Sequence, residues 1–261
     1  MKRTNSFEEL GLSDNLLQAV KKKGFEEPTA IQALTIPVML RDDTNIIAQA
    51  QTGTGKTAAF GLPLIEMVDA GAGTVQALIL APTRELAIQV SEEISSLKGN
   101  KELLVMPIYG GQSIDQQLRR LKKGVHIVVG TPGRVIDHLK RKTLRIGSIE
   151  HLILDEADEM LNMGFIDDIE LIMKYTNKSK RTLLFSATMP KRIKDLARTY
   201  MKGYELLKSK KEQLVTNLTE QIYFEVKAVD KFEALCRIID IEEGFYSLVF
   251  CRTKKDVDKV S

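Results

Sequence analysis

The chain has 261 residues, of which 43% are hydrophobic and 28% are charged, and its formal net charge is +3. This composition excludes disordered, collagen-like and low-complexity classes, and the length predicts one large domain or one domain plus part of another. No apolar run approaches the ~18 residues of a membrane span, and the first residues lack the apolar stretch of a secretory signal, so we expect no membrane partner.

Charge and cysteine content give further information on the class of protein, its partners and its location. The small basic excess lies before residue 208, where it permits a basic surface but does not by itself predict a nucleic-acid partner. Cys236 and Cys251 are too few for a disulfide framework, so we expect a reducing, cytoplasmic location. The three histidines are scattered and show no metal-ligand spacing.

Short apolar runs alternate with amphipathic segments over the first 206 residues. The apolar runs predict buried strands at 45–50, 77–81, 103–108, 126–130, 151–154 and 181–186. The segments between them predict helices at 56–68, 83–97, 113–122, 133–140 and 191–201. This alternation predicts an α/β fold in which a parallel sheet is sandwiched by helices, and ligands bind at the carboxyl ends of such strands.

The most specific motif follows the first predicted strand. Residues 50–57 read AQTGTGKT and lead into a helix, which is the context of a phosphate-binding loop. Lys56 can reach the β- and γ-phosphates of a nucleotide, and the hydroxyl of Thr57 can ligate Mg²⁺. Ala50 stands where the general pattern has its first glycine, and an ordinary glycine-rich turn is the competing interpretation.

A second motif, DEAD, occupies residues 155–158 at the end of the fifth apolar run. A carboxylate there faces the phosphate loop, so Asp155 is expected to hold Mg²⁺ through water. Glu156 is expected to orient and deprotonate the attacking water. An acidic helix start, favoured by the helix dipole, is the alternative for this motif taken alone.

The last part of the chain has a different character. Residues 202–219 are polar and weakly periodic, and they are followed by a second alternation with strands at 221–226 and 246–251 and helices at 230–239 and 253–260. We therefore divide the chain into a first domain at 1–206, a linker at 207–219 and the start of another domain at 220–261.

With both motifs in place, the chain resembles the DEAD-box family of ATP-dependent RNA helicases. The motifs of that family occur in its usual order over essentially the whole chain, and the alanine at position 50 is usual for it. They are the Q motif at 24–32 with an upstream Phe7, motif I at 50–57, motif Ia at 82–87, GG at 110–111, motif Ib at 131–134, DEAD at 155–158, SAT at 186–188 and motif IV at 248–253. The resemblance implies a RecA-like P-loop NTPase domain followed by an incomplete second RecA-like domain.

The resemblance implies an ATP site with Mg²⁺. Gln32 is implied to read the adenine edge and Phe25 to stack on the ring. Without the family, a helix-surface amide for Gln32 and a core aromatic for Phe25 are the favoured interpretations. The implied catalytic residues are Lys56, Asp155 and Glu156. The implied ATP-binding residues are Phe25, Gln32, Gln51, Thr52, Gly53, Thr54, Gly55, Lys56 and Thr57.

The resemblance also implies RNA contacts that are independent of sequence, because few of the groups could read a base edge. These residues are Pro82, Thr83, Arg84, Gly110, Gly111, Thr131, Gly133 and Arg134. Plain turn chemistry explains the GG and TPGR segments as well, and a solvated or ion-paired helix residue explains Arg84. Asp158, Ser186 and Thr188 are implied to couple the ATP state to the second domain, while a helix cap is the alternative for Thr188.

The given sequence ends shortly after motif IV, before the arginine-rich motif that supplies the family's arginine finger. We therefore expect this chain to bind ATP and RNA weakly and to hydrolyse little ATP, since such a finger contributes ~10³–10⁵ in rate. Within the family the activity is RNA-stimulated ATP hydrolysis with local, non-processive duplex unwinding or remodelling, which needs the rest of the second RecA-like domain as a partner. A short natural nucleotide- or RNA-binding module is the alternative.

Overall fold

The structure is a computed structural model, and it describes residues 6–209, 220, 222–242, 244 and 246–261. The chain divides into two compact units, Met1–Glu212 and Gln213–Ser261. The first unit contains the sheet and all of the predicted catalytic residues.

The first unit is built on a seven-stranded sheet in the order β3-β4-β2-β5-β6-β1-β7, with every neighbouring pair parallel. The strands are β1 (Ile46–Gln49), β2 (Ala77–Leu80), β3 (Val105–Ile108), β4 (Ile127–Gly130), β5 (His151–Leu154), β6 (Arg181–Ser186) and β7 (Glu205–Lys208). Strands β2, β4, β5 and β6 are buried along their whole length, which explains why they are apolar runs without alternation.

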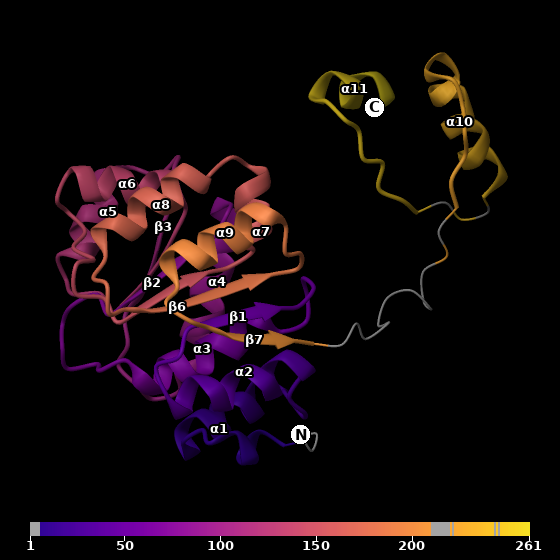
Figure 1. Cartoon of the computed structure of the whole chain (residues 1–261). Helices are drawn as coiled ribbons and strands as arrows, with labels where there is room; N and C mark the ends of the chain where they lie inside the picture. The colour runs from indigo at the N-terminus through magenta and orange to yellow at the C-terminus, as the bar shows by residue number, and fades with distance from the viewer. Residues whose placement is uncertain (1–5, 210–219, 221, 243, 245) are drawn as a thin grey trace. The chain divides into compact units, whose positions relative to one another are not determined.

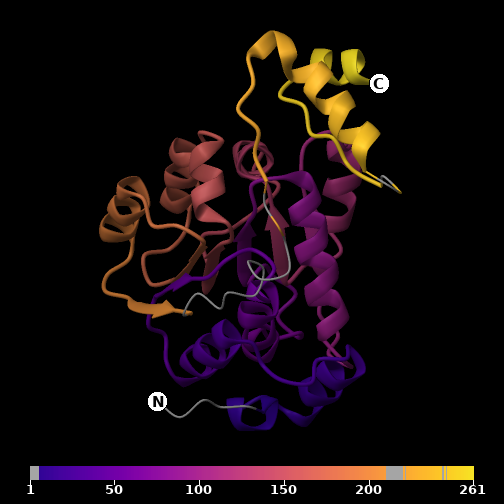
Figure 2. The ribbon, with the colours of Figure 1, turned by 90° about the vertical axis from the view of Figure 1, so that its right-hand side faces the viewer.

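Helices cover both faces of this sheet (Figure 1). They are η1 (Phe7–Leu10), α1 (Asp14–Lys22), α2 (Ala30–Arg41), α3 (Lys56–Met67), α4 (Arg84–Leu97), α5 (Ile114–Leu121), α6 (Pro132–Lys140), α7 (Ala157–Asn162), α8 (Ile166–Tyr175) and α9 (Lys191–Tyr200). In both views, α1 and α2 lie across the sheet from α7, α8 and α9 (Figures 1 and 2). None of the described helices is long and apolar enough to cross a membrane.

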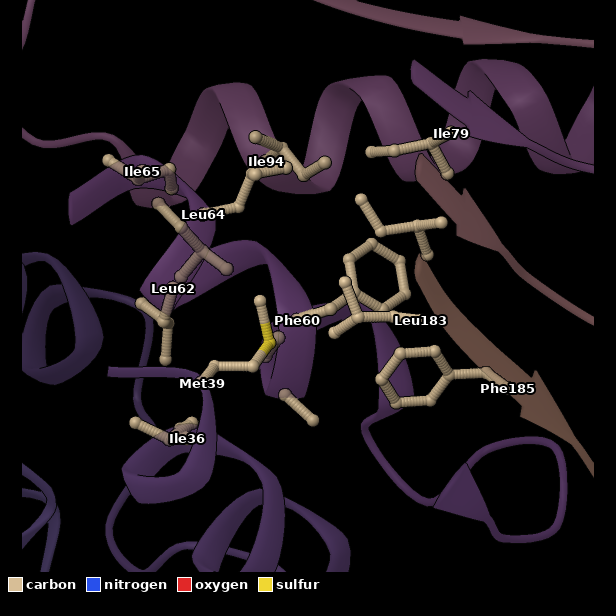
Figure 3. Packing of buried hydrophobic residues seen from close by; sticks show 14 of the residues in the cluster. Ile36, Met39, Phe60, Leu62, Leu64, Ile65, Ile79, Ile94, Leu183 and Phe185 are labelled. Atoms are coloured by element: carbon tan, nitrogen blue, oxygen red, sulfur yellow. The ribbon is translucent and has the colours of Figure 1, made fainter. Parts of the chain in front are cut away.

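Alternate strand residues supply two separate cores, one on each face. In β2, Ile79 packs with the cluster under α1–α4, whereas Leu78 packs with the cluster under α6–α9. The first cluster is centred on Phe60 and Phe185, whose rings lie 5.0 Å apart at an interplanar angle of 57° (Figure 3). Complete burial of such side chains stabilises the fold by roughly 2 kcal/mol each, so the sheet is held firmly from both sides.

The six strands predicted from the apolar runs are confirmed, with ends that shift by at most two residues. The seventh strand, β7, was missed, and it extends to Lys208, past residue 207, where the linker is predicted to start. Residues 205–208 pair with β1 in parallel, from Ile46 opposite Glu205 to Gln49 opposite Lys208. As an edge strand with only Leu207 buried, β7 carries too few apolar residues to be recognised from its sequence.

In the described part of the second unit, the helices are η2 (Ala228–Asp230), α10 (Lys231–Ile241) and α11 (Lys254–Val260), close to the predicted helices. The predicted strands are not formed at 222–226 and 246–251, and Gln221 lies outside the described residues. Tyr223, Tyr246 and Phe250 are at least 83% exposed there. A strand needs neighbouring strands and a covered face to be stable, and these residues have neither.

Candidate functional site

The loop between β1 and α3 has the backbone of a phosphate-binding turn. Gly53 and Gly55 have φ angles of +81° and +82°, a left-handed conformation that favours glycine. The hydroxyl of Thr54 donates to the carbonyl of Gln51 at 2.7 Å and closes the loop. Because α3 starts at Lys56, its free N–H groups and its positive dipole end lie at this loop.

Lys56 and Asp155 form the charged floor of the site. Lys56 is 6% exposed, and its Nζ has no hydrogen-bond partner among the residues that the structure describes. Asp155 is 5% exposed, and burial raises its pKa to about 6, although the positive charge of Lys56 opposes the shift. A buried ammonium without a partner is unfavourable, so this geometry fits an anionic ligand such as a nucleotide phosphate.

Glu156 is held beside the phosphate loop by a left-handed turn. Its φ and ψ angles are both 51°, which is an uncommon conformation for a residue other than glycine. This turn joins the end of β5 directly to α7, and it brings Glu156 Oε1 within 3.3 Å of the hydroxyl of Thr52, which donates to it. A carboxylate at the carboxyl edge of the sheet therefore lies next to the predicted position of the phosphates.

These parts meet at one cavity of about 220 Å³. Its walls include most of the predicted ATP and catalytic residues, namely Phe25, Thr52, Gly53, Gly55, Lys56, Thr57, Asp155 and Glu156. Gln89 and Glu93 of α4 also line it, and they were not predicted. The only signal in the sequence was their spacing of one helical turn, which does not distinguish a site-facing pair from a solvated one.

Gln32 lies behind the loop and is engaged within the protein. Its Nε2 donates to the carbonyl of Gly55 at 3.2 Å, and its Oε1 accepts from the backbone N–H of Thr29 at 2.9 Å in a capping box at the start of α2. The amide groups that the prediction assigns to adenine are thus bonded to the chain itself. Gln32 therefore connects the start of α2 to the phosphate loop.

The DEAD and SAT segments are directly bonded. Both the backbone N–H and the hydroxyl of Thr188 donate to Asp158 Oδ2 at 2.8 Å. Burial acts to raise the pKa of Asp158, but hydrogen bonding at the SAT segment, chiefly from Thr188, outweighs burial and holds the pKa below its ordinary value. The hydroxyl of Ser186 also donates to the carbonyl of Thr188 at 2.6 Å. The three residues predicted to couple ATP to the second domain are therefore one bonded group.

The predicted RNA residues follow three neighbouring strands. Because the sheet order includes β3-β4-β2, the segments at 110–111, 131–134 and 82–84 lie at adjacent carboxyl ends. Gly110, Gly111 and Gly133 are exposed, whereas Pro82 is buried. The hydroxyl of Thr83 caps α4 by accepting from Leu86 N–H at 3.2 Å.

Two arginines of this surface are placed differently. The guanidinium of Arg84 is exposed and lies 4.9 Å above the ring of Tyr109, where it is free to meet a phosphate. The side chain of Arg134 is only 13% exposed, and its Nη1 donates to the carbonyl of Gln112 at 3.1 Å. Arg84 is thus accessible to a ligand, whereas Arg134 faces the interior of the unit.

A family model described as DEAD/DEAH box helicase matches residues 29–196 of the chain, which is more than half of its length. The chain belongs to the DEAD/DEAH box helicase family. It is 54% identical over 256 residues to a probable ATP-dependent RNA helicase of Methanocaldococcus jannaschii. It is 53% identical over 256 residues to the DEAD-box ATP-dependent RNA helicase CshA of Bacillus cereus.

Solved structures of this helicase family agree with the fold. A DEAD box protein from the hyperthermophile Methanococcus jannaschii matches 98% of the chain with a TM-score of 0.77 and 54% identity, over 69% of its own chain. A hypothetical ATP-dependent RNA helicase from Sulfolobus tokodaii matches 76% of the chain with a TM-score of 0.70 and 36% identity, over 57% of its own. The predicted RecA-like α/β fold is confirmed.

The chain corresponds to only part of these relatives. It spans 68% of the length of the Methanocaldococcus jannaschii helicase and 49% of the length of the Bacillus cereus helicase, while 98% of the chain itself is matched in each case. The matched part contains the whole sheet of the first unit and extends into the second unit.

Proposed function

We propose that the first unit binds ATP with Mg²⁺ and the sugar-phosphate backbone of RNA, and that it is the nucleotide-binding half of an RNA-stimulated ATPase and helicase. The observation that carries this proposal is the 220 Å³ cavity, in which Lys56 Nζ is buried without a partner beside Asp155 and Glu156. The names of the relatives, both ATP-dependent RNA helicases, support the same activity.

In the transfer of a phosphoryl group to water, each residue around the cavity has a separate role. Lys56 and the N–H groups of the glycine loop bind the β- and γ-phosphates and stabilise the charge that develops on them. Glu156 orients the attacking water and accepts its proton. Held by Thr57 and, through water, by Asp155, Mg²⁺ would neutralise phosphate charge.

The metal in this proposal is bound together with the nucleotide. Within the ranges that the structure describes, no group of three or more His, Cys, Asp or Glu side chains is arranged to hold a metal ion alone. Mg²⁺ is usually held by one or two carboxylates plus substrate phosphates, so the residues at the cavity fit this mode.

RNA binding in this proposal is independent of base sequence. The exposed groups of the predicted RNA segments are the backbone of three glycines (Gly110, Gly111 and Gly133) and the side chain of Arg84, with the half-buried residues Thr83 and Thr131 beside them, and such groups suit phosphate and sugar contacts. Unwinding requires a second domain that closes on RNA. In the described residues 222–261 the apolar side chains are largely exposed, so we propose that the 261-residue chain alone binds both ligands weakly, hydrolyses little ATP and unwinds nothing.

The test measures binding of a fluorescent ATP analogue and ATP hydrolysis with and without single-stranded RNA, with Lys56→Ala and Glu156→Gln as controls. We expect binding by the parent chain and by Glu156→Gln, its loss in Lys56→Ala, and low turnover throughout. Equal analogue binding by Lys56→Ala would reject the site. Robust RNA-dependent turnover by the parent chain would reject the claim of low activity, and competition by duplex DNA as strong as by duplex RNA would reject the RNA preference.

A further inference from the structure

A cluster of polar side chains is buried behind the predicted RNA surface, between α5 and α6. Gln117 of α5 is 1% exposed and His138 of α6 is 0% exposed, so neither side chain can touch a ligand. The cluster lies between the glycine turn (residues 109–112), in which Gly110 and Gly111 are exposed, and the start of α6, where the N-cap Thr131 is half-buried and Gly133 is exposed. A fully buried polar cluster must satisfy its own hydrogen bonds, and this one does so with the glycine turn.

The side-chain amide of Gln117 is the centre of the cluster. Its Nε2 donates to the carbonyl of Tyr109 and to Oε1 of Gln112, both at 3.0 Å. Its Oε1 accepts from Arg134 Nη1 at 3.3 Å and faces His138 Nε2 at 2.9 Å. An amide offers two donor hydrogens and two acceptor sites, so the bonding capacity of Gln117 is completely used.

This arrangement fixes the protonation state of His138. The oxygen of an amide carries no hydrogen and can only accept, so His138 Nε2 carries the proton of its bond to Gln117 Oε1. The other ring nitrogen, Nδ1, lies 2.9 Å from the hydroxyl of Thr143. Burial, reinforced by the charge of Arg134, lowers the pKa of His138, so the ring is a neutral Nε2–H donor.

Arg134 extends the cluster to the residue after the glycines. Its Nη1 also donates to the backbone carbonyl of Gln112 at 3.1 Å, and its Nε lies 3.7 Å from Asp137 on the next turn of α6. The guanidinium is therefore directed at the glycine turn instead of at the surface. Its position in the TPGR motif predicted a direct RNA contact, and the geometry favours a different use.

We infer that Gln117, His138 and Arg134 are positioning residues that hold the glycine turn and the start of α6 as one rigid surface for RNA. The bonds reach Tyr109, which immediately precedes Gly110, and Gln112, which immediately follows Gly111, so both ends of the exposed glycine pair are fixed. RNA affinity then depends on side chains that never meet RNA. This inference rests on the proposed RNA function of the same surface.

The matched variants are His138→Leu and His138→Gln in the full chain. Leucine removes the Nε2–H donor, whereas glutamine places an amide N–H at a similar distance from the backbone and can keep the bond to Gln117. Gln117→Leu is the second disruptive variant, since it removes every bond at the centre of the cluster while keeping the volume. Affinity for a fluorescein-labelled oligouridylate is measured by anisotropy, and affinity for a fluorescent ATP analogue is measured in parallel.

We expect both leucine variants to bind the oligouridylate roughly tenfold more weakly, as loss of a buried hydrogen-bond partner predicts. His138→Gln should stay within a factor of about two of the parent, and the ATP analogue should bind equally to all folded variants. Unchanged oligouridylate affinity in both leucine variants would overturn the inference, as would equal weakening by His138→Gln and His138→Leu.

Amide hydrogen exchange of residues 109–113, measured without RNA, separates this inference from the proposed function. We expect faster exchange there in both leucine variants and parent-like exchange in His138→Gln. If the parent chain does not bind the oligouridylate, the RNA function is rejected, and the exchange comparison still decides whether the cluster positions the turn. Parent-like exchange in all three variants would overturn the positioning role.

Discussion

The residues at the cavity are individually unfavourable for folding. Lys56 holds a buried ammonium without a partner, Asp155 is buried with a raised pKa, and Glu156 adopts a left-handed backbone. An unsatisfied buried group costs ~1–3 kcal/mol, and a strained backbone residue costs a similar amount. The rest of the unit offsets these terms, and a bound phosphate with its cation relieves the first two of them.

Gly53→Ala and Gly55→Ala form a matched pair at the phosphate loop. Both glycines have φ angles near +80°, so both substitutions strain the backbone, but a Cβ on Gly55 would lie 2.5 Å from Gln32 Nε2, whereas one on Gly53 meets nothing within 4 Å. We expect the free energy of unfolding to fall by ~1–2 kcal/mol for Gly53→Ala, as left-handed strain predicts, and by more for Gly55→Ala. Urea denaturation of both variants without nucleotide measures this, and equal losses would show that the Gln32 contact is unimportant.

His151 makes the stability of the first unit sensitive to pH. Burial, with a smaller effect of Arg181, lowers the pKa of His151 to about 4, so the folded chain keeps the ring neutral. The unfolded chain binds a proton below pH ~6.5, so stability is full above that pH and is lost as pH falls towards 4. Between about pH 7 and pH 5 the parent should therefore lose roughly 2 kcal/mol more than His151→Leu.

Urea denaturation of the parent and of His151→Leu at these two pH values provides the measurement. The comparison cancels every other titrating group, because both proteins share them. If the two proteins lose equal stability between the two pH values, the folded and unfolded states have the same affinity for this proton, and the prediction is wrong.

At the scale of elements, the burial of a strand determines whether the sequence predicts it. The central strands are continuous apolar runs because both faces are covered, so they were predicted almost to the residue. The edge strand β7 and the predicted strands at 222–226 and 246–251 depend on pairing with neighbours, which no local pattern records. The site residues were predicted where phosphate or metal binding requires particular residues at a fixed spacing, as in the GKT and DEAD motifs.

The buried polar cluster around Gln117 is only weakly indicated by the sequence. Gln117 falls three residues after Ile114 and four before Leu121, which places a polar residue on the apolar face of that helix. A polar residue in an apolar stripe indicates a buried hydrogen-bonded group, but it does not name the partners. Those partners come from α6 and the glycine turn, which only the folded chain brings together.

Gly130 and Gly133 test the packing of the β4–α6 connection. A Cβ on Gly130 would lie 2.6 Å from Val135 Cγ2 and 2.8 Å from Ile108 Cγ1, whereas one on Gly133 meets nothing within 4 Å. We expect Gly130→Ala to lower the free energy of unfolding by ~1–3 kcal/mol through overpacking. Gly133→Ala should leave it unchanged or raise it by up to ~1 kcal/mol, because alanine is the better helix former.

Thermal unfolding of these two glycine variants beside the parent checks the difference. A parent-like Tm for Gly130→Ala would mean that β3 and α6 can move apart at no cost. That outcome would also weaken the case for a rigid surface there, since Ile108 directly precedes the glycine turn and Val135 directly follows Arg134.

At the scale of the first unit, the strand order places the proposed ATP residues and the proposed RNA residues at different positions along the carboxyl edge of the sheet. The segments after β1 and β5 carry most of the proposed ATP and catalytic residues, and those after β3, β4 and β2 carry the proposed RNA residues. The two sets of segments meet between β2 and β5, where Asp155 N–H donates to the carbonyl of Leu80 at 2.9 Å. A bound nucleotide at Asp155 is therefore one hydrogen bond from the strand that leads to the RNA segment at 82–84.

At the scale of the whole chain, we expect residues 1–212 to fold and bind the ATP analogue without the second unit. All seven strands and both cores lie in Met1–Glu212. In the second unit, the described residues expose large apolar side chains, including Tyr223 at 83%, Tyr246 at 103% and Phe250 at 91%. Exposed apolar clusters of this kind bind hydrophobic dyes.

The fragment and the full chain should therefore share a Tm and an affinity for the ATP analogue, while only the full chain enhances the fluorescence of 8-anilinonaphthalene sulfonate. A fragment that unfolds, or that loses nucleotide affinity, would show that the second unit contributes to the first core or to its site. Equal dye binding by both proteins would instead place the exposed apolar surface within residues 1–212. Because the three readouts are independent, each result assigns one property, namely stability, nucleotide affinity or apolar exposure, to one of the two units.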